Sequence, residues 1–137
     1  MYKRQVQKGE SSALVSQIDL YASLASLLDV KLEDDEAVDS HDIMSSLMNA
    51  NVKGREELLE ESFTLSIREG KYKYIKPITV KNLPKWLSNK NVETGLLEEV
   101  QLYDLSKDVS EKDNIANENK ELVERLDRKI DSIVSIN

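Results

Sequence analysis

Apolar residues recur at helical spacing near both ends of the chain and at the shorter spacing of strands in its middle. Four apolar residues share one face of a predicted helix over residues 16–29, and they are Ile18, Tyr21, Ala25 and Leu28. Ser16 and Asp19 have the spacing of a capping box, in which a hydroxyl and a carboxylate bind amide protons of the first turn. The pattern therefore predicts an amphipathic helix that begins directly after Ser16.

A second, shorter helix is predicted to follow an acidic stretch. Residues 33–36 are all acidic, so they have little to bury and are expected to form a solvated loop. Ser40 is the expected N-cap of a helix that ends at Met48. Its inward stripe is predicted to consist of Ile43, Met44, Leu47 and Met48.

After Gly54 the spacing changes to that of strands, first around Leu58. Residues 64–76 are predicted to form a β-hairpin with Glu69-Gly70 at its turn, because glycine adopts a positive φ without a Cβ clash. Residues 77–100 contain both prolines and are expected to form a long irregular excursion, the kind of loop that is usually functional. A short strand is then predicted over 100–105.

The chain is predicted to close with a helix over residues 119–134. Its inward positions are Leu122, Leu126, Ile130 and Ile133. The order of elements suits an α+β fold, in which helices gather on one side of a small antiparallel sheet. We expect the C-terminal helix to pack on one face of that sheet.

Composition removes several functional classes. The chain has 19 Lys+Arg against 26 Asp+Glu, a formal net charge of −7, which disfavours a general nucleic-acid binder. It has no Cys, which excludes disulfides, thiolate zinc sites and Cys nucleophiles. No apolar run approaches the roughly 18 residues of a membrane span. No nucleic-acid or membrane partner is therefore expected.

His41 is the only His, and acidic and hydroxyl residues surround it. Neighbours in sequence on a helix point in different directions, so this cluster does not build a Ser/His/Asp triad, and a surface His is the favoured interpretation. The nearby acidic residues lack the alternating ligands and turn glycine of a calcium loop. We expect a solvated acidic loop there and no catalytic or metal residue in this chain.

A local excess of positive charge lies between residues 68 and 90, where the only acid is Glu69. This basic strip consists of Arg68, Lys71, Lys73, Lys76, Lys81, Lys85 and Lys90. Trp86, the only Trp, lies within it, so Lys81, Lys85 and Trp86 are candidate contacts for an anionic sugar. The favoured interpretation is nevertheless structural, an edge strand guarded by lysines with Trp86 packed beneath the loop. Tyr72 and Tyr74 are predicted to share one sheet face as packing residues.

Residues 15–29 read VSQIDLYASLASLLD, and they are followed by Asp39-Ser40, by Leu47 and by Lys53-Gly-Arg55. These segments resemble the "VSQxDLxxTLxxL" helix and the "DS…LL…GR" stretch of the arylsulfatase-type sulfatases of the alkaline-phosphatase-like superfamily. Residues 67–75 resemble "xRxGxWKYI", with Tyr72 in the place of Trp. Residues 101–116 resemble "xLYDLxxDPxExxNLA", with Val109 in the place of Pro.

The resemblance implies that this chain is the C-terminal portion of a sulfatase. Residues 6–56 would be terminal helices of the large domain and 57–137 the C-terminal subdomain. The family's formylglycine and calcium chemistry lies upstream of the matched region, so both groups are expected only in the full-length parent. The implied partners are the upstream catalytic part of the same sulfatase and, as parent substrate, a sulfated sugar or aryl sulfate ester. A periplasmic or secreted parent is expected on the same ground.

Residues 1–5 match nothing in the family and resemble the translation of a sequencing adaptor, so we expect the natural sequence to begin near Val6. The leading hypothesis is a sulfatase fragment that is inactive alone and shapes the rim of a substrate cleft. The alternative is an independent α+β interaction module that binds an acidic partner through the basic loop. An exposed apolar face on the helix at 17–29 is also expected, since that helix would pack against the absent parent domain.

Overall fold

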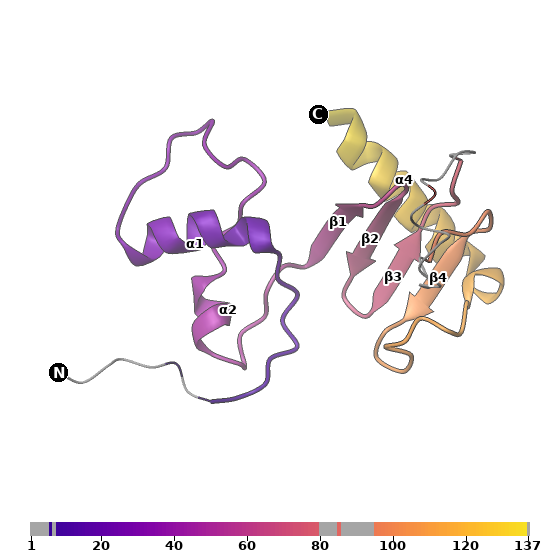
Figure 1. Cartoon of the computed structure of the whole chain (residues 1–137), viewed down its shortest axis with the longest axis horizontal. Helices are drawn as coiled ribbons and strands as arrows, with labels where there is room; N and C mark the ends of the chain where they lie inside the picture. The colour runs from indigo at the N-terminus through magenta and orange to yellow at the C-terminus, as the bar shows by residue number, and fades with distance from the viewer. Residues whose placement is uncertain (1–5, 7, 80–84, 86–94, 137) are drawn as a thin grey trace. The chain divides into compact units, whose positions relative to one another are not determined.

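The computed structural model describes residues 6, 8–79, 85 and 95–136, and the chain divides into two compact units, Met1–Leu58 and Leu59–Asn137. The first unit holds the 3₁₀ helix η1 (Gln17–Asp19) and the helices α1 (Leu20–Leu27) and α2 (Met44–Met48). The second holds most of a sheet and the C-terminal helix (Figure 1). The assignment of 6–56 and 57–137 to two parts of a sulfatase stays a prediction. In the described part of the chain, no helix has the length and apolar character needed to cross a membrane.

The first predicted helix begins where the sequence indicates. Ser16 is the N-cap of η1, which continues directly into α1, and the Asp19 carboxylate accepts the Ser16 N–H at 3.1 Å. The helix ends at Leu27 because Asp29 adopts a φ of 54°. Val30 N–H then donates to the Ala25 carbonyl at 2.9 Å, which satisfies a carbonyl of the last turn. The helix therefore ends two residues before the predicted end at residue 29.

The second helix is shorter than predicted, and Ser40 does not cap it. The helix α2 begins at Met44, and the Asp42 carboxylate accepts the Met44 N–H at 3.0 Å. The predicted inward stripe is also wrong in part. Ile43 is buried, but Leu47 and Met48 are exposed, and the buried residue of α2 is Ser46.

The sheet of the second unit has four strands in the order β1-β2-β3-β4. They are β1 (Glu57–Glu61), β2 (Leu65–Glu69), β3 (Tyr72–Ile75) and β4 (Gln101–Asp104). The predicted hairpin is confirmed, with Glu69 opposite Tyr72, so its turn residues are Gly70 and Lys71, one position later than expected. Gly70 has a φ of 55°, the conformation for which glycine was expected.

The C-terminal helix α4 (Lys120–Ile136) follows the short η2 (Ala116–Glu118) and packs on one face of the sheet (Figure 1). Cross-strand pairing places Ile67, Tyr74 and Leu102 in one row on that face. Leu126 and Ile130 of α4 are fully buried against them. This row and the helix stripe form the core of the unit, which confirms the predicted α+β fold with a terminal helix on one sheet face.

The outer edge of β4 is covered by the chain that follows it. The Asn114 side chain accepts the Leu102 N–H at 3.0 Å and donates to the Val100 carbonyl at 3.0 Å. Ile115 N–H donates to the Leu102 carbonyl at 2.9 Å. An edge strand needs such partners because its backbone groups otherwise remain open to another chain.

Candidate functional site

A buried polar cluster in the first unit gathers residues from three places in the sequence. Asp19 is fully buried, and its carboxylate accepts the His41 N–H at 2.9 Å and the Arg55 Nε–H at 2.7 Å. The Arg55 guanidinium also bonds the other carboxylate oxygen and the Asp39 carbonyl. Burial opposes ionisation of Asp19, but these hydrogen bonds outweigh it and lower its pKa to about 2. The cluster therefore holds an ion pair at neutral pH.

Two serines extend this cluster along α1. The Ser40 hydroxyl donates to the Ile18 carbonyl at 2.7 Å and accepts the Ala22 N–H at 3.0 Å. The fully buried Ser23 accepts the Ile43 N–H at 3.0 Å. The prediction that Ser40 caps α2 is wrong. Its hydroxyl instead binds the Ile18 carbonyl, which lies 22 residues earlier at the start of the first helix. Both serines fasten the segment before α2 to α1.

The backbone of Leu14 lies against the backbone of Gly54, which explains why a glycine precedes Arg55. The Arg55 N–H donates to the Leu14 carbonyl at 2.7 Å. A Cβ at Gly54 would lie 2.0 Å from that same carbonyl oxygen. The Gly54-Arg55 pair of the family-like stretch therefore serves close backbone packing and the ion pair with Asp19.

None of these groups is arranged for catalysis or for a metal. The described residues contain no group of three or more His, Cys, Asp or Glu side chains that could hold a metal ion. His41 is exposed and joins the cluster through its backbone. Asp19, the buried carboxylate, is occupied by Arg55 and backbone amides. The described residues therefore do not fit the calcium of a sulfatase, and formylglycine has no Cys precursor here.

Three lysines of the basic strip, Lys71, Lys73 and Lys76, are paired with carboxylates from distant parts of the chain. The single acid within the strip, Glu69, instead binds Arg125 and, at 2.6 Å, Lys129 of α4. The other pairs are Lys71 with Asp104 at 2.9 Å, Lys73 with Glu111 at 2.7 Å, and Lys76 with Asp127 at 2.8 Å and Asp131 at 2.7 Å. The strip is basic in sequence, but in the structure much of its charge is neutralised within the unit.

Tyr72 and Tyr74 lie on the α4 face as packing residues, as predicted. The Tyr74 hydroxyl donates to Asp127 at 2.7 Å. Burial, together with this carboxylate, raises the pKa of Tyr74 far above its usual range. The phenol therefore stays neutral and joins β3 to α4, and it offers no stacking surface to a ligand.

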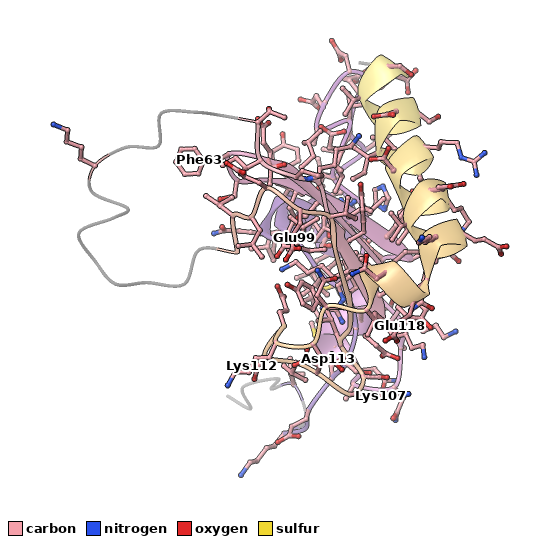
Figure 2. The ribbon with its side chains drawn as sticks, turned by 90° about the vertical axis from the view of Figure 1, so that its right-hand side faces the viewer. Phe63, Glu99, Lys107, Lys112, Asp113 and Glu118 are labelled. Carbon is pink, nitrogen blue, oxygen red and sulfur yellow. The ribbon has the colours of Figure 1, made fainter. Side chains whose placement is uncertain are left out.

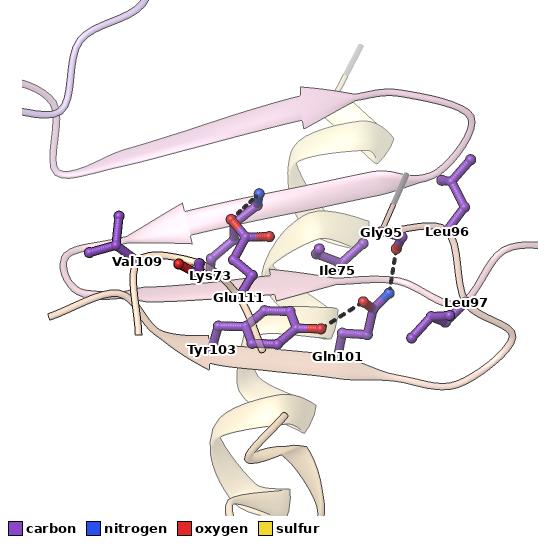
Figure 3. Close-up of a pocket in the computed structure, with 10 residues that line it drawn as sticks. Lys73, Ile75, Gly95, Leu96, Leu97, Gln101, Tyr103, Val109 and Glu111 are labelled. Atoms are coloured by element: carbon purple, nitrogen blue, oxygen red, sulfur yellow. Dashed lines mark hydrogen bonds and ion pairs between the residues drawn. The ribbon is translucent and has the colours of Figure 1, made fainter. Parts of the chain in front are cut away.

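The sheet face turned away from α4 carries a cavity of about 610 Å³ (Figure 3). Its polar lining is paired internally, since Gln101 donates to the Gly95 carbonyl at 2.8 Å and accepts the Tyr103 hydroxyl at 2.9 Å. Lys73 and Glu111 form an ion pair at its wall. Across the described residues, no buried side-chain nitrogen or oxygen lacks a hydrogen-bond partner. The polar groups that line this cavity therefore bind one another within the unit.

The predicted rim contacts are only partly described. Lys85 is exposed. Lys81 and Trp86 lie outside the described residues, as does the adaptor-like segment 1–5. The base of the loop that carries them is closed by the Ile78 N–H, which donates to the Leu97 carbonyl at 2.9 Å.

Sequence reasoning missed the pairing of Arg55 with Asp19 and the edge-covering role of Asn114. Arg55 and Asn114 lie in segments that resemble the sulfatase family, and this resemblance was the one indication in the sequence that they matter. Spacing alone could not find them, because their partners are 36 and 12 residues away.

Comparison with known proteins finds similarity to a sulfatase. A curated relative, the N-acetylgalactosamine-6-O-sulfatase of Bacteroides thetaiotaomicron, is 37% identical over 130 residues, which are 93% of this chain and 25% of that protein. No family model matches the chain.

Solved structures support the same relationship. A chain from work on the metabolism of multiple glycosaminoglycans by Bacteroides thetaiotaomicron has a TM-score of 0.82 at 37% identity, covering 93% of this chain and 26% of that one. A crystal structure of Ps i-CgsB shares the fold, with a TM-score of 0.61 at 21% identity over 88% of this chain and 24% of that one. The sulfatase hypothesis is supported, and the independent interaction module is not. Over 93% of its length the chain is similar to a sulfatase, and it spans about a quarter of the length of the curated relative that it matches.

Proposed function

We propose that this chain supplies scaffold and a cleft rim to a sulfuric-ester hydrolase and turns over no sulfate ester alone. The observation that carries the proposal is the 37% identity with a sulfatase over 93% of this chain but only 25% of the relative. The segments that resemble the sulfatase family build a buried ion pair, a close backbone contact and a covered sheet edge. All three contacts hold the fold together, as expected for a part of an enzyme that supplies scaffold.

The proposed substrate class is a sulfated sugar, with the name of the curated relative as its support. The rim is the loop over residues 76–100, with Lys81, Lys85 and Trp86 as its contacts. A positively charged rim would draw an anionic substrate towards a cleft and raise its local concentration. The upstream part of the parent, with formylglycine and calcium, would perform the chemistry.

The test is a hybrid enzyme, in which this chain replaces the matching quarter of the Bacteroides thetaiotaomicron N-acetylgalactosamine-6-O-sulfatase. Sulfate release from N-acetylgalactosamine 6-sulfate is measured for the hybrid, for the unaltered relative, and for the relative without its matching quarter. We expect activity from the first two only. A folded hybrid that releases no sulfate, or turnover by the 137-residue chain alone, would contradict the proposal.

A further inference from the structure

The helix α1 turns its apolar side towards water and its polar side towards the interior of the first unit. At about 100° per residue, five large apolar side chains of the helix and its C-cap cover an arc of about 120°, the width of a stripe that normally faces a core. All five are between 42% and 70% exposed, and this outer stripe consists of Leu20, Tyr21, Leu24, Leu27 and Leu28. On the opposite side of the helix, Asp19 and Ser23 are fully buried. The usual amphipathic order is therefore inverted in α1.

The helix α2 shows the same inversion. Its buried residue is Ser46, whose hydroxyl donates to the Lys53 carbonyl at 2.7 Å. Leu47 and Met48 are exposed. Polar contacts therefore occupy positions in the described part of the first unit where apolar packing is usual.

The second unit has the ordinary order, so the inversion is specific to the first. Leu126 and Ile130 of α4 are fully buried against the sheet. Figure 2 shows charged side chains such as Glu99, Lys112 and Glu118 at the surface, where they are exposed. The exposure of the outer stripe is thus not a general property of the chain.

The polar side of α1 holds the helix in place without burial of the outer stripe. Asp19 binds the His41 N–H and the Arg55 side chain, and the Ser23 hydroxyl accepts the Ile43 N–H. Burial of apolar area is the dominant favourable contribution to folding and to association, and here it is left unused. The outer stripe is therefore a preformed surface that a partner can cover.

Most of the related sulfatase lies outside the part that this chain matches. The match spans 25% of that protein, which leaves about three quarters of it as a source of the covering surface. Joined to this chain in one polypeptide, that part would act at an effective concentration of about 1 mM. A second copy of the chain at micromolar concentration would compete poorly. The page of contacts within α1 and this missing length together favour the rest of the parent as the occupant.

We propose that the outer stripe of α1 docks in an apolar groove of the sulfatase polypeptide that lies outside this chain. This inference rests on the proposed function and names the surface that joins this part to the rest of the enzyme. A groove is required because side chains that spread over about 120° of a helix do not all reach one flat surface. The polar contacts of Asp19 and Ser23 keep the stripe oriented for docking.

The test compares one pair of substitutions in two settings. Leu24→Lys with Leu28→Lys places two charges in the outer stripe and keeps the helix, because Lys and Leu have similar helix propensities. In the 137-residue chain, diluted until it is monomeric, we expect an unchanged urea midpoint because both positions are exposed there. In the hybrid enzyme we expect the melting temperature to fall by about 5 °C or more, because the two charges would be buried in an apolar groove. Val134→Lys, at an exposed position of α4, is the control and should change neither quantity.

The outcomes separate this inference from the proposed function. A hybrid whose melting temperature is unchanged by the double substitution would overturn the docking and leave the proposed function intact. A lower urea midpoint in the isolated chain would also overturn it, since the stripe would then pack within this chain. A dimeric hybrid that the double substitution separates would make a second copy the occupant and overturn it as well. An unsubstituted folded hybrid that releases no sulfate would contradict the proposed function, while the melting temperatures would still decide the docking.

Discussion

Arg55 and Asp19 form a buried ion pair across 36 residues, with the Arg55 Nε 2.7 Å from a carboxylate oxygen of Asp19. The Asp19 side chain is 0% exposed and that of Arg55 is 9% exposed. The pair joins the start of α1 to the segment that leads into β1. Both charges are shielded from water and share hydrogen bonds with the backbone, so removal of one partner would leave the other charge buried and uncompensated.

Removal of one partner of this ion pair should lower the stability of the first unit. Asp19→Asn leaves the Arg55 guanidinium buried without its counter-charge, and we expect a loss of about 3–5 kcal/mol in the free energy of unfolding. Hydrogen exchange of the amides in residues 8–58 measures this unit separately. Asp34→Asn, in the exposed acidic loop, is the matched control and should have little effect. Equal protection in both variants would contradict the role of the pair.

The same carboxylate should make stability depend on pH in the acid range. The pKa of Asp19 is lowered from 3.8 to about 2, so its contribution is fully present above pH 3.8 and is lost as the pH falls through about 2. Glu69 behaves in the same way in the second unit, from 4.5 to about 2, because Arg125 and Lys129 bind it. We expect the urea midpoint to fall between pH 4.5 and 2 and the fall to be smaller in Glu69→Gln. A flat profile would count against both ion pairs.

Position 54 is predicted to require glycine, because there is no room for a side chain at Gly54. In Gly54→Ala the new Cβ would lie 2.0 Å from the Leu14 carbonyl oxygen, so the backbone must move and the Arg55–Leu14 hydrogen bond is weakened. We expect a loss of about 2 kcal/mol or more, because a side chain forced against a backbone atom makes the surrounding chain shift. Gly9→Ala is the control, because its Cβ would meet Ala50 at an ordinary 3.6 Å. Equal urea midpoints for the two variants would refute this explanation.

Local patterns predicted the elements of the second unit well because strand alternation and helical spacing are properties of neighbouring residues. The hairpin at Gly70 and the inward stripe of α4 at Leu126 and Ile130 are of this kind. The first unit was predicted less well, since Ser40 has the local chemistry of a helix cap but bonds residues 18 and 22 instead. Distant polar partners override a local preference.

The basic strip shows the same limit of local sequence patterns. The excess of lysine over residues 68–90 was visible in the sequence, but the acids that neutralise Lys73 and Lys76 lie in a later loop and on α4. No local pattern links these positions. The positive φ of 61° at Phe63 was likewise not predictable, because the residue type favours a strand and this φ arises from the tight turn between β1 and β2.

The proposed rim predicts a charge effect on substrate binding. In the hybrid enzyme, Lys85→Glu should raise the KM for N-acetylgalactosamine 6-sulfate several-fold, about threefold or more at low salt, and the effect should shrink as salt screens the charge. Lys107→Glu is the control, since Lys107 is also exposed but follows β4 at the opposite end of the sheet. An unchanged KM for Lys85→Glu would remove this residue from the rim.

The exposed apolar face of α1 predicts that the 137-residue chain associates with itself. Tyr21 and Leu24 of α1 are 55% and 50% exposed, and Leu28, which caps the helix, is 70% exposed. So much exposure of large apolar side chains on one side of a short helix is unusual. In the parent we expect this face to be covered by the part of the sulfatase that the chain does not span. Sedimentation velocity should show dimers or larger species whose fraction rises with concentration. Leu24→Lys with Leu28→Lys should shift the chain towards monomer, whereas Val134→Lys, on α4, should not. A monodisperse wild-type monomer with a cooperative melt would show that this face needs no cover.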